Sequence, residues 1–284
     1  MTSSLEKTKP KLRTDEIITC DVMVGFDRVE NSSIDLVITS PPYNIGIEYD
    51  SWNDSLPWQE YLDWCRLWIR EIRRVLKPDG RFAINVLVEM GIDNNKKRVS
   101  PQVEFYKILQ EEGLNMMAMP LWVDPTKSTL TAWGSWQSAS APYIYNPSEV
   151  ILIGYNEFAK KQSQGESTCS REDFIHAVSG IWKIIPEKDS ITKVCFPLEL
   201  PKLAIEILTY KGDTVLDPFM GSGTTAVAAK ITGRHWLGFE ISNHYAELAR
   251  LRVEGASSDV TLDPMKKVLK GTKKSKNSVT SFFS

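Results

Sequence analysis

The chain has 284 residues, of which 42% are hydrophobic and 25% charged, a composition typical of one large or two modest globular domains. No stretch approaches the roughly 20 consecutive apolar residues of a membrane span, and the N-terminus lacks an apolar secretory core. We therefore expect an intracellular protein with no membrane partner. Disulfides and a metal site are not expected, because the candidate ligands are few, widely spaced and form no CxxC pair: Cys20, Cys65, Cys169, Cys195, His176, His235 and His244.

The formal net charge of −2 conceals an uneven distribution. Residues 266–284 contain six lysines and no acidic residue, which leaves 28 basic and 36 acidic residues in the rest of the chain. Such a block is most often a solvated, disordered tail, but it can also act as an electrostatic arm for nucleic-acid phosphates. Composition leaves both interpretations open.

Short β-rich runs alternate with helix-period segments along the chain, a pattern typical of an α/β fold. The central runs are almost continuously apolar, as expected for parallel strands that are covered on both faces. The predicted strands are Glu16–Cys20, Asp35–Thr39, Arg81–Leu87, Glu149–Gly154, Thr214–Leu216 and His235–Phe239.

The clearest predicted helix covers residues 58–76, where apolar and aromatic side chains recur at intervals of three and four. Either Asp54 or Ser55 can cap its N-terminus, and Pro57 suits its first turn. The sequence Lys77-Pro78-Asp79-Gly80 should end it.

Aromatic residues occur in two different settings. Trp58 and Trp68 lie at helical spacing, so we expect them to pack in the core rather than to form a base-stacking surface. Residues 124–147 are polar and turn-rich yet contain two tryptophans and two tyrosines. That combination is typical of a long functional loop.

A second predicted helix, over residues 200–208, leads through Gly212 to a strand and then to the turn DPFMGSGTT, residues 217–225. Two glycines in this turn let a ligand approach the backbone, and the helix that follows offers free N–H groups. Glu240 ends the next strand, where an acidic residue can bind ribose hydroxyls. The absence of GxxxxGK[ST] and of a third glycine argues against a P-loop and a dinucleotide site. Asp217 would repel phosphates but attract a cationic amino or sulfonium group, which predicts S-adenosylmethionine.

A second motif, Thr39-Ser40-Pro41-Pro42-Tyr43-Asn44, directly follows the apolar strand DLVIT. The two prolines cannot continue a strand ladder and fix an extended turn. This turn would present the Ser40 oxygen and the Pro41 carbonyl as acceptors, with Tyr43 beside them as an aromatic surface. A planar base with an exocyclic amine suits such a site.

Together, the two motifs resemble those of the DNA amino-methyltransferases, which methylate an exocyclic nitrogen of cytosine or adenine. The family's catalytic S/D/N-PPY/F/W motif matches residues 40–43, and its FxGxG motif matches residues 219–223. Similarity extends to CDVMVGFDRVENSSIDLVITSPPYN, RRVLKPDGRFAINV and CFPLELPKLAIEIL. The catalytic motif precedes the cofactor motif, as in the permuted β group of the family. The resemblance implies a Rossmann-like, doubly wound and mostly parallel sheet with an inserted target-recognition region.

The resemblance also implies a set of site residues. The expected catalytic residues are Ser40, Pro41, Pro42 and Tyr43. The expected cofactor-binding residues are Asp217, Pro218, Phe219, Gly221, Ser222, Gly223, Thr224, Glu240, Phe196 and Asp21.

We divide the chain into five expected regions: an N-terminal arm (1–14), a catalytic half (15–154), a target-recognition region (155–190), a cofactor-binding half (191–263) and a basic tail (264–284). The loops around residues 96–98 and 131–140 can share in recognition. Recognition candidates within 155–190 are Lys160, Lys161, Arg171, His176 and Trp182.

The resemblance implies in-line methyl transfer to an amine of a base that has left the double helix. Ser at the start of the PPY motif favours cytosine N4, with adenine N6 as the alternative. Carbon-5 methylation is excluded because no cysteine follows a proline. A DNA-binding protein without turnover is the alternative of a different class. The resemblance implies double-stranded DNA and a cognate restriction endonuclease as partners, in the cytoplasm of a prokaryotic cell. The chain can be a monomer or a homodimer.

Overall fold

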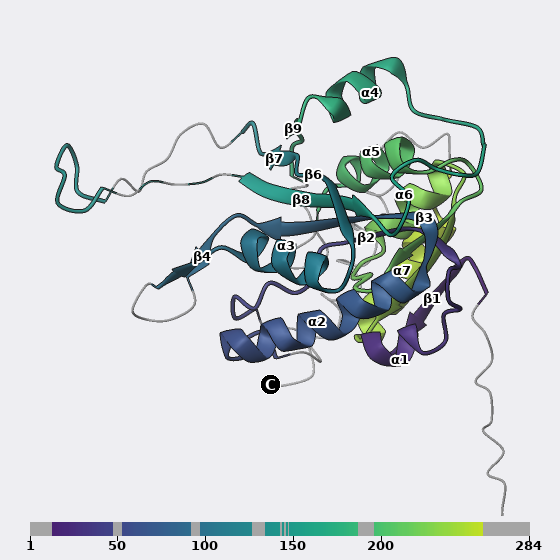
Figure 1. Ribbon diagram of the computed structural model, residues 1–284, viewed down its shortest axis with the longest axis horizontal. Coiled ribbons are helices and arrows are strands. Elements are labelled where there is room, and N and C mark those ends of the chain that lie inside the picture. The colour runs from purple at the N-terminus through teal and green to yellow at the C-terminus, as the bar shows by residue number, and fades with distance from the viewer. Residues whose placement is uncertain are drawn as a thin grey trace, which may run out of the picture.

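A computed structural model describes residues 13–47, 53–91, 97–126, 134–142, 144, 146, 148–186 and 196–257. Its centre is one large sheet with the strand order β1-β11-β10-β2-β3-β8-β7-β9, and β6 also pairs with β8 (Figure 1). The strands of this sheet are β1 (Glu16–Thr19), β2 (Ile34–Thr39), β3 (Leu76–Leu87), β6 (Asn115–Ala118), β7 (Leu121–Val123), β8 (Ser148–Tyr155), β9 (Ile181–Lys183), β10 (Thr214–Asp217) and β11 (His235–Glu240).

The sheet is mostly parallel, as predicted. Strands β1, β11, β10, β2 and β3 are parallel neighbours, whereas β8 runs antiparallel to β3, β6 and β7. The first residues of β8 therefore lie beside the last residues of β3, and Glu149 is opposite Leu87. A separate small ribbon consists of β4 (Met90–Gly91) and β5 (Arg98–Val99).

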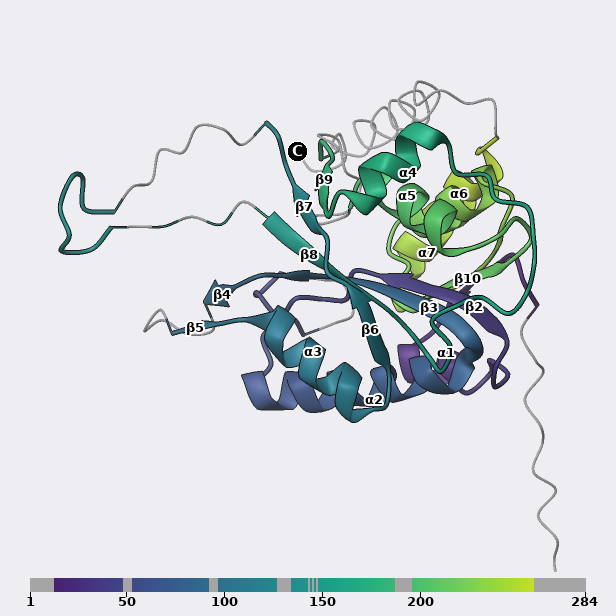
Figure 2. The same ribbon diagram turned by 45° about the horizontal axis from the view of Figure 1, so that its top comes forward.

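Helices cover both faces of the sheet, with α4 to α7 on one side and α1 to α3 on the other (Figure 2). Each face has its own apolar cluster, which explains why the central strands are apolar at nearly every position. The helices are α1 (Val22–Phe26), α2 (Trp58–Val75), α3 (Pro101–Glu111), α4 (Arg171–Val178), α5 (Glu199–Leu208), α6 (Thr224–Ile231) and α7 (Asn243–Glu254).

The six predicted strands and the two predicted helices are present, but the surroundings of α2 differ from the prediction in two respects. Helix α2 ends at Val75, just before Lys77-Pro78-Asp79-Gly80, as predicted, but β3 begins earlier than predicted, at Leu76, which pairs with Ile34. A register shift between Ile34 and Leu36 accommodates the extra residues. Neither Asp54 nor Ser55 caps α2; the N-cap is Pro57, without a side-chain hydrogen bond.

The predicted loop 124–147 connects β7 to β8, and its described part includes an isolated bridge between Gly134 and Pro142. Most of the predicted N-terminal arm and the whole basic tail, residues 264–284, lie outside the described residues. Within the described part of the chain, no helix is both long and apolar enough to cross a bilayer.

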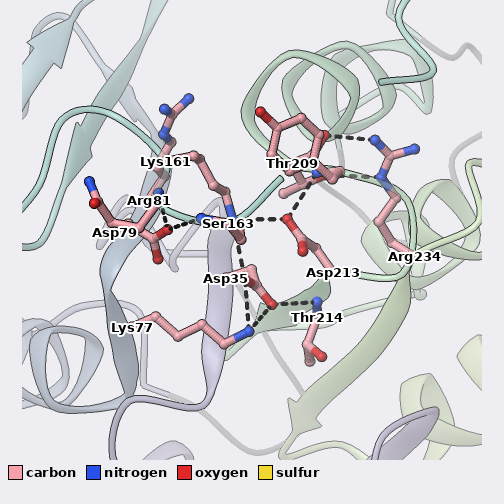
Figure 3. Close-up of polar contacts among 12 residues, drawn as sticks. Asp35, Lys77, Asp79, Arg81, Lys161, Ser163, Thr209, Asp213, Thr214 and Arg234 are labelled. Carbon is pink, nitrogen blue, oxygen red and sulfur yellow. Dashed lines mark hydrogen bonds and ion pairs between the residues drawn. The ribbon is translucent and has the colours of Figure 1, made fainter. Parts of the chain in front are cut away.

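A buried network of ion pairs joins the amino ends of the parallel strands (Figure 3). Lys161 Nζ lies 2.9 Å from Asp213 Oδ2 and 3.2 Å from Asp35 Oδ1, and its side chain is only 6% exposed. Lys77 Nζ contacts Asp35 Oδ2 at 2.8 Å, and the Thr214 N–H donates to the same oxygen at 2.9 Å. Lys161 was a recognition candidate, but this inward pairing keeps its ammonium group from a DNA surface.

Candidate active site

The catalytic motif lies at the carboxyl end of β2, where its side chains enter a hydrogen-bonded cluster. Ser40 Oγ donates to the Tyr43 hydroxyl at 2.8 Å, and this hydroxyl donates to Glu149 Oε2 at 2.7 Å. Asn85 Nδ2, from β3, donates to the Tyr43 hydroxyl at 2.8 Å and to Glu149 Oε2 at 2.6 Å. Tyr43 is 8% exposed, so its ring is held largely inside the protein, and its stacking on a target base stays a prediction.

Asp54 organises the backbone that follows the catalytic motif. Its carboxylate accepts hydrogen bonds from the N–H groups of Asn44 and Ile45 at 2.8 and 3.0 Å, and from Ile47 at 3.0 Å. Asn44 has a positive φ of 58°, and its side-chain amide both donates to and accepts from the backbone of Leu56. Asp54 is buried by this loop, which explains why it does not cap α2.

Helix α2 supports both motifs from one face. The Tyr61 hydroxyl donates to the Pro42 carbonyl at 2.7 Å. Phe219 of the cofactor turn packs against Trp64 and Trp68, with ring centroids 5.5 and 5.3 Å apart. Trp68 is fully buried and Trp58 stacks on Tyr61, which confirms that both predicted tryptophans serve packing.

Asp217 connects the cofactor turn to the catalytic strand. Its Oδ1 accepts from Thr39 Oγ1 at 2.7 Å and from the Phe219 N–H at 3.0 Å, and its Oδ2 accepts from Thr225 Oγ1 at 2.6 Å. Burial raises the pKa of Asp217 to about 6, although the hydrogen bonds from Thr225, Thr39 and Phe219 oppose this rise. Thr39 immediately precedes Ser40, so one buried carboxylate fixes the two motifs to each other.

Glu240 holds the middle of the cofactor turn. Its Oε2 accepts from the Gly221 N–H at 2.8 Å, and its Oε1 accepts from the Ser242 N–H at 2.8 Å. From α7, Arg252 donates to both the carbonyl and the hydroxyl of Ser222 at 2.7 Å. The turn is therefore tied to β11 and α7 as well as to β2.

Both glycines of the turn adopt the left-handed backbone conformation, with positive φ, but their surroundings differ. Gly223 has φ +86°, and a Cβ there would lie 2.8 Å from Ala249 Cβ. Gly221 has φ +52°, and the nearest atom to a Cβ there is Phe219 O at 4.0 Å. Gly221 therefore leaves space through which a ligand can approach the backbone, whereas Gly223 is required for packing against α7.

These surroundings predict different costs for the two alanine substitutions. Gly221→Ala should destabilise the fold by about 1 kcal/mol, because only backbone strain is added. Gly223→Ala should cost about 2–4 kcal/mol, because overpacking against Ala249 adds to the strain. Urea unfolding measures the free energy of unfolding of both variants. Equal losses in the two would show that the contact of residue 223 with α7 does not affect stability.

The remaining predicted cofactor residues lie in the turn itself, beneath α5 and at the start of α1. Pro218 and Thr224 are buried within the turn. Phe196, 8% exposed, belongs to the apolar cluster beneath α5. Asp21 caps α1 by accepting from the Met23 N–H at 2.9 Å.

The expected recognition region contributes α4 and the sheet-edge strand β9. Trp182 is fully buried and donates to the Ala177 carbonyl, so it does not form part of a surface. His176 Nε2 accepts from the Lys183 N–H, whereas the side chains of Lys160 and Arg171 are exposed. Recognition by this region stays a prediction, now limited to its exposed side chains.

Sequence reasoning missed Asn85 and Glu149 as members of the cluster, and it gave Thr39 no role although Thr39 begins the motif. Asn85 is a polar residue within the apolar run FAINV, and Glu149 is a carboxylate at the start of the run VILIG. Each could have been noticed as a polar interruption of a buried strand. Among the described residues, no group of three or more histidine, cysteine or acidic side chains could hold a metal ion.

Comparisons with known proteins show the family and the fold. The family model described as DNA methylase, N6_N4_Mtase, matches residues 34–251. The Type II methyltransferase M.MjaVI of Methanocaldococcus jannaschii is 42% identical over 153 residues, which cover 54% of this chain and 77% of that protein.

Solved structures share the fold. TTHA0409 of Thermus thermophilus, in complex with S-adenosyl-L-methionine, matches with a TM-score of 0.66 and 27% identity over 85% of this chain and 96% of its own. PvuII DNA methyltransferase (cytosine-N4-specific) matches with a TM-score of 0.66 over 92% of this chain and 94% of its own, and at 20% identity shows the fold alone. Since the family model spans most of the chain and the two motifs meet at one sheet edge, the chain belongs to the N6/N4 DNA methylase family, whose cofactor is S-adenosyl-L-methionine.

Proposed function

We propose that this protein transfers a methyl group from S-adenosyl-L-methionine to the N4 amine of cytosine in double-stranded DNA, as the modification enzyme of a restriction–modification system. The observation that carries the proposal is the cluster at the end of β2, where Ser40 is linked to Tyr43, Asn85 and Glu149. A cognate restriction endonuclease is the proposed second partner, because relatives such as M.MjaVI are Type II methyltransferases.

The residues around the cofactor turn fit this cofactor. Gly221 leaves open space beside the backbone, and Asp217 and Glu240 supply negative charge at the ends of adjacent strands. We assign the amino and sulfonium charges to the field of Asp217 and the ribose hydroxyls to Glu240. When bound, the cofactor supplies an electrophilic methyl group.

The chain's own residues would orient and polarise the target amine. Its lone pair is delocalised into the base, so acceptors must draw the N–H groups away from the ring plane as positive charge develops. Ser40 Oγ and the Pro41 carbonyl are the proposed acceptors.

Adenine N6 is the alternative target, since a serine can accept a hydrogen bond from the amine of either base. The preference for cytosine comes from the serine that opens the PPY motif. The alternative of a different class is a protein that binds DNA without methylating it. That alternative does not explain why Ser40, Tyr43, Asn85 and Glu149 form a hydrogen-bonded cluster.

Mass spectrometry of nucleosides from DNA co-expressed with the full chain tests the proposal without knowledge of the recognition site. We expect N4-methylcytosine, and DNA from cells that express Ser40→Ala serves as the control. N6-methyladenine alone would overturn the choice of cytosine. No methylated amine at all would overturn the enzymatic function.

The basic tail offers a test of the DNA partner. We expect deletion of residues 266–284 to weaken binding to all DNA sequences alike and to flatten its salt dependence, because six lysines can neutralise phosphates but read no bases. Binding titrations at several salt concentrations measure the slope. An unchanged slope would show that the tail has no contact with DNA.

A further inference from the structure

Two hydrogen bonds lead in one direction from Ser40 to a carboxylate. Ser40 Oγ donates to the Tyr43 hydroxyl, and the Tyr43 hydroxyl donates to Glu149 Oε2. The Asn85 backbone carbonyl also lies 3.4 Å from the Tyr43 hydroxyl, but the Glu149 carboxylate is closer, at 2.7 Å, and is the stronger acceptor. Each hydroxyl has a single hydrogen, so the Tyr43 hydrogen points to Glu149 and the Ser40 hydrogen to Tyr43. Ser40 Oγ is thereby left with lone pairs, not a hydrogen, for a group that binds beside it.

Asn85 fixes the direction of this path. Its Nδ2 donates to both the Tyr43 hydroxyl and Glu149 Oε2, whereas its carbonyl oxygen in the same place would face the carboxylate and be repelled. Two donors are directed at Glu149 Oε2, so the path ends at the carboxylate, the one acidic group among these four side chains. Hydrogen bonds in such a chain polarise one another, so the charge of Glu149 strengthens Ser40 Oγ as an acceptor.

The position of Glu149 follows from the sheet rather than from the motif. Strand β8 runs antiparallel to β3, which brings Glu149 to the edge where β2 and β3 end. Glu149 is partly exposed, so a proton that reaches it can pass to solvent. The Glu149 carboxylate is thus connected through two successive hydrogen bonds to Ser40, the residue that we assign to the target amine.

We propose that Glu149 is a positioning residue that also receives the proton released by methyl transfer, acting through Tyr43 and Ser40. This inference rests on the amino-methylation proposed above. The target nitrogen forms a bond to the methyl carbon, the carbon–sulfur bond breaks with its electron pair on sulfur, and the nitrogen must lose one proton. That proton passes to Ser40 Oγ as the Ser40 hydrogen moves to Tyr43 and the Tyr43 hydrogen moves to Glu149 Oε2.

Charge balances along this path. Before transfer there is one sulfonium cation and one Glu149 carboxylate, and afterwards there is a neutral thioether, a neutral methylated amine and a neutral carboxylic acid. Ser40 and Tyr43 begin and end as neutral hydroxyls. No oxidant, reductant or further reactant is required.

The test compares two substitutions of Glu149 in the full chain under single-turnover conditions, with excess enzyme, tritiated cofactor and unmethylated DNA of mixed sequence. Glu149→Gln keeps the size but cannot take up a proton, so the transfer rate should fall about 10- to 100-fold. Glu149→Asp keeps the carboxylate on a shorter stem and should retain more activity than Glu149→Gln. A purely structural role predicts the opposite order, because glutamine is the closer match in shape.

Controls separate chemistry from binding and folding. The dissociation constants for cofactor and DNA should change less than about threefold in both variants, because Glu149 acts on the transfer step. Glu111→Gln, which removes an exposed ion pair with Arg66 on the surface, is the matched control and should transfer at the wild-type rate. Tyr43→Phe breaks the same path at its middle and should lose a similar factor, and Glu149→Gln added to it should cost nothing more.

A Glu149→Gln rate within twofold of wild type, or an aspartate variant slower than the glutamine variant, overturns the inference and leaves the proposed function standing. Additive losses in the double variant overturn it as well. Wild-type protein that transfers no methyl group to DNA overturns the proposed function, and the inference falls with it. If a Glu149 variant does not fold, the methyl-transfer rate of Tyr43→Phe tests the inference instead. A Tyr43→Phe rate equal to that of the wild type overturns the inference.

Discussion

Replacement of Ser40 by alanine should slow methyl transfer by roughly 10²- to 10³-fold, the usual cost of an electrostatic contact that tightens in the transition state. The structure adds a reason to expect that binding survives. Among the described residues the Ser40 side chain donates to Tyr43 alone, and Asn85 and Glu149 continue to hold the Tyr43 hydroxyl in its absence. Single-turnover transfer of tritiated methyl groups measures the rate, and calorimetric titration measures cofactor affinity.

Ser33→Ala is the matched control, because Ser33 lies just before the opposite end of the same strand and its hydroxyl donates to the Glu30 carbonyl, away from the cluster. This variant should transfer methyl groups at the wild-type rate. Full activity in Ser40→Ala would remove Ser40 from the mechanism, whereas lost cofactor binding would show that the substitution disturbs the whole loop.

The fold could be predicted from the sequence where local pattern and tertiary environment agree. Continuous apolar runs predicted β2, β10 and β11, because both faces of these strands are covered by helices. Strands β6, β7 and β9 were not predicted, since they are short and their pairing with β8 and with each other determines them. The start of β3 was missed because its Lys-Pro-Asp-Gly sequence is typical of a turn. The backbone does bend there, since a Cβ on Gly80 would lie 2.9 Å from the Lys77 nitrogen, and only the pairing of Leu76 with Ile34 of β2 places the beginning of the strand before the bend.

The same contrast between local pattern and long-range pairing explains which members of the candidate site the sequence could indicate. Ser40 and Tyr43 could be proposed as candidates because they belong to one contiguous motif, and Asp217 because it begins another. Asn85 and Glu149 are 64 residues apart and become neighbours only through the antiparallel register of β3 and β8.

Lys161 shows the converse error. Its charge predicted an exposed side chain, but Asp35 and Asp213, far away in the sequence, make a buried position favourable.

Asp217→Asn should weaken cofactor binding by roughly 1.5–3 kcal/mol at neutral pH, the scale of a lost charged hydrogen bond. Asparagine keeps the shape and an acceptor for Thr39 or Thr225 but removes the negative charge from a fully buried position. Asp217→Ala should lose affinity and also destabilise the fold by about 3 kcal/mol, because the donors of Thr39, Thr225 and Phe219 lose their acceptor. Calorimetric titration and urea unfolding separate the two effects.

The pH dependence gives the sharper test, because burial raises the pKa of Asp217 to about 6 in the free protein. A bound cation favours the charged carboxylate and lowers this pKa, so wild-type affinity should be full above pH 6 and fall as the pH drops through that value. The stability of the free protein has the opposite dependence. The folded-state pKa exceeds the unfolded value of about 3.9, so protonation of Asp217 stabilises the fold below the unfolded value, and this contribution is lost as the pH rises toward 6. Asp217→Asn should remove both slopes; a variant that keeps the wild-type fall in affinity would show that another group titrates and that Asp217 does not act on the cofactor through its charge.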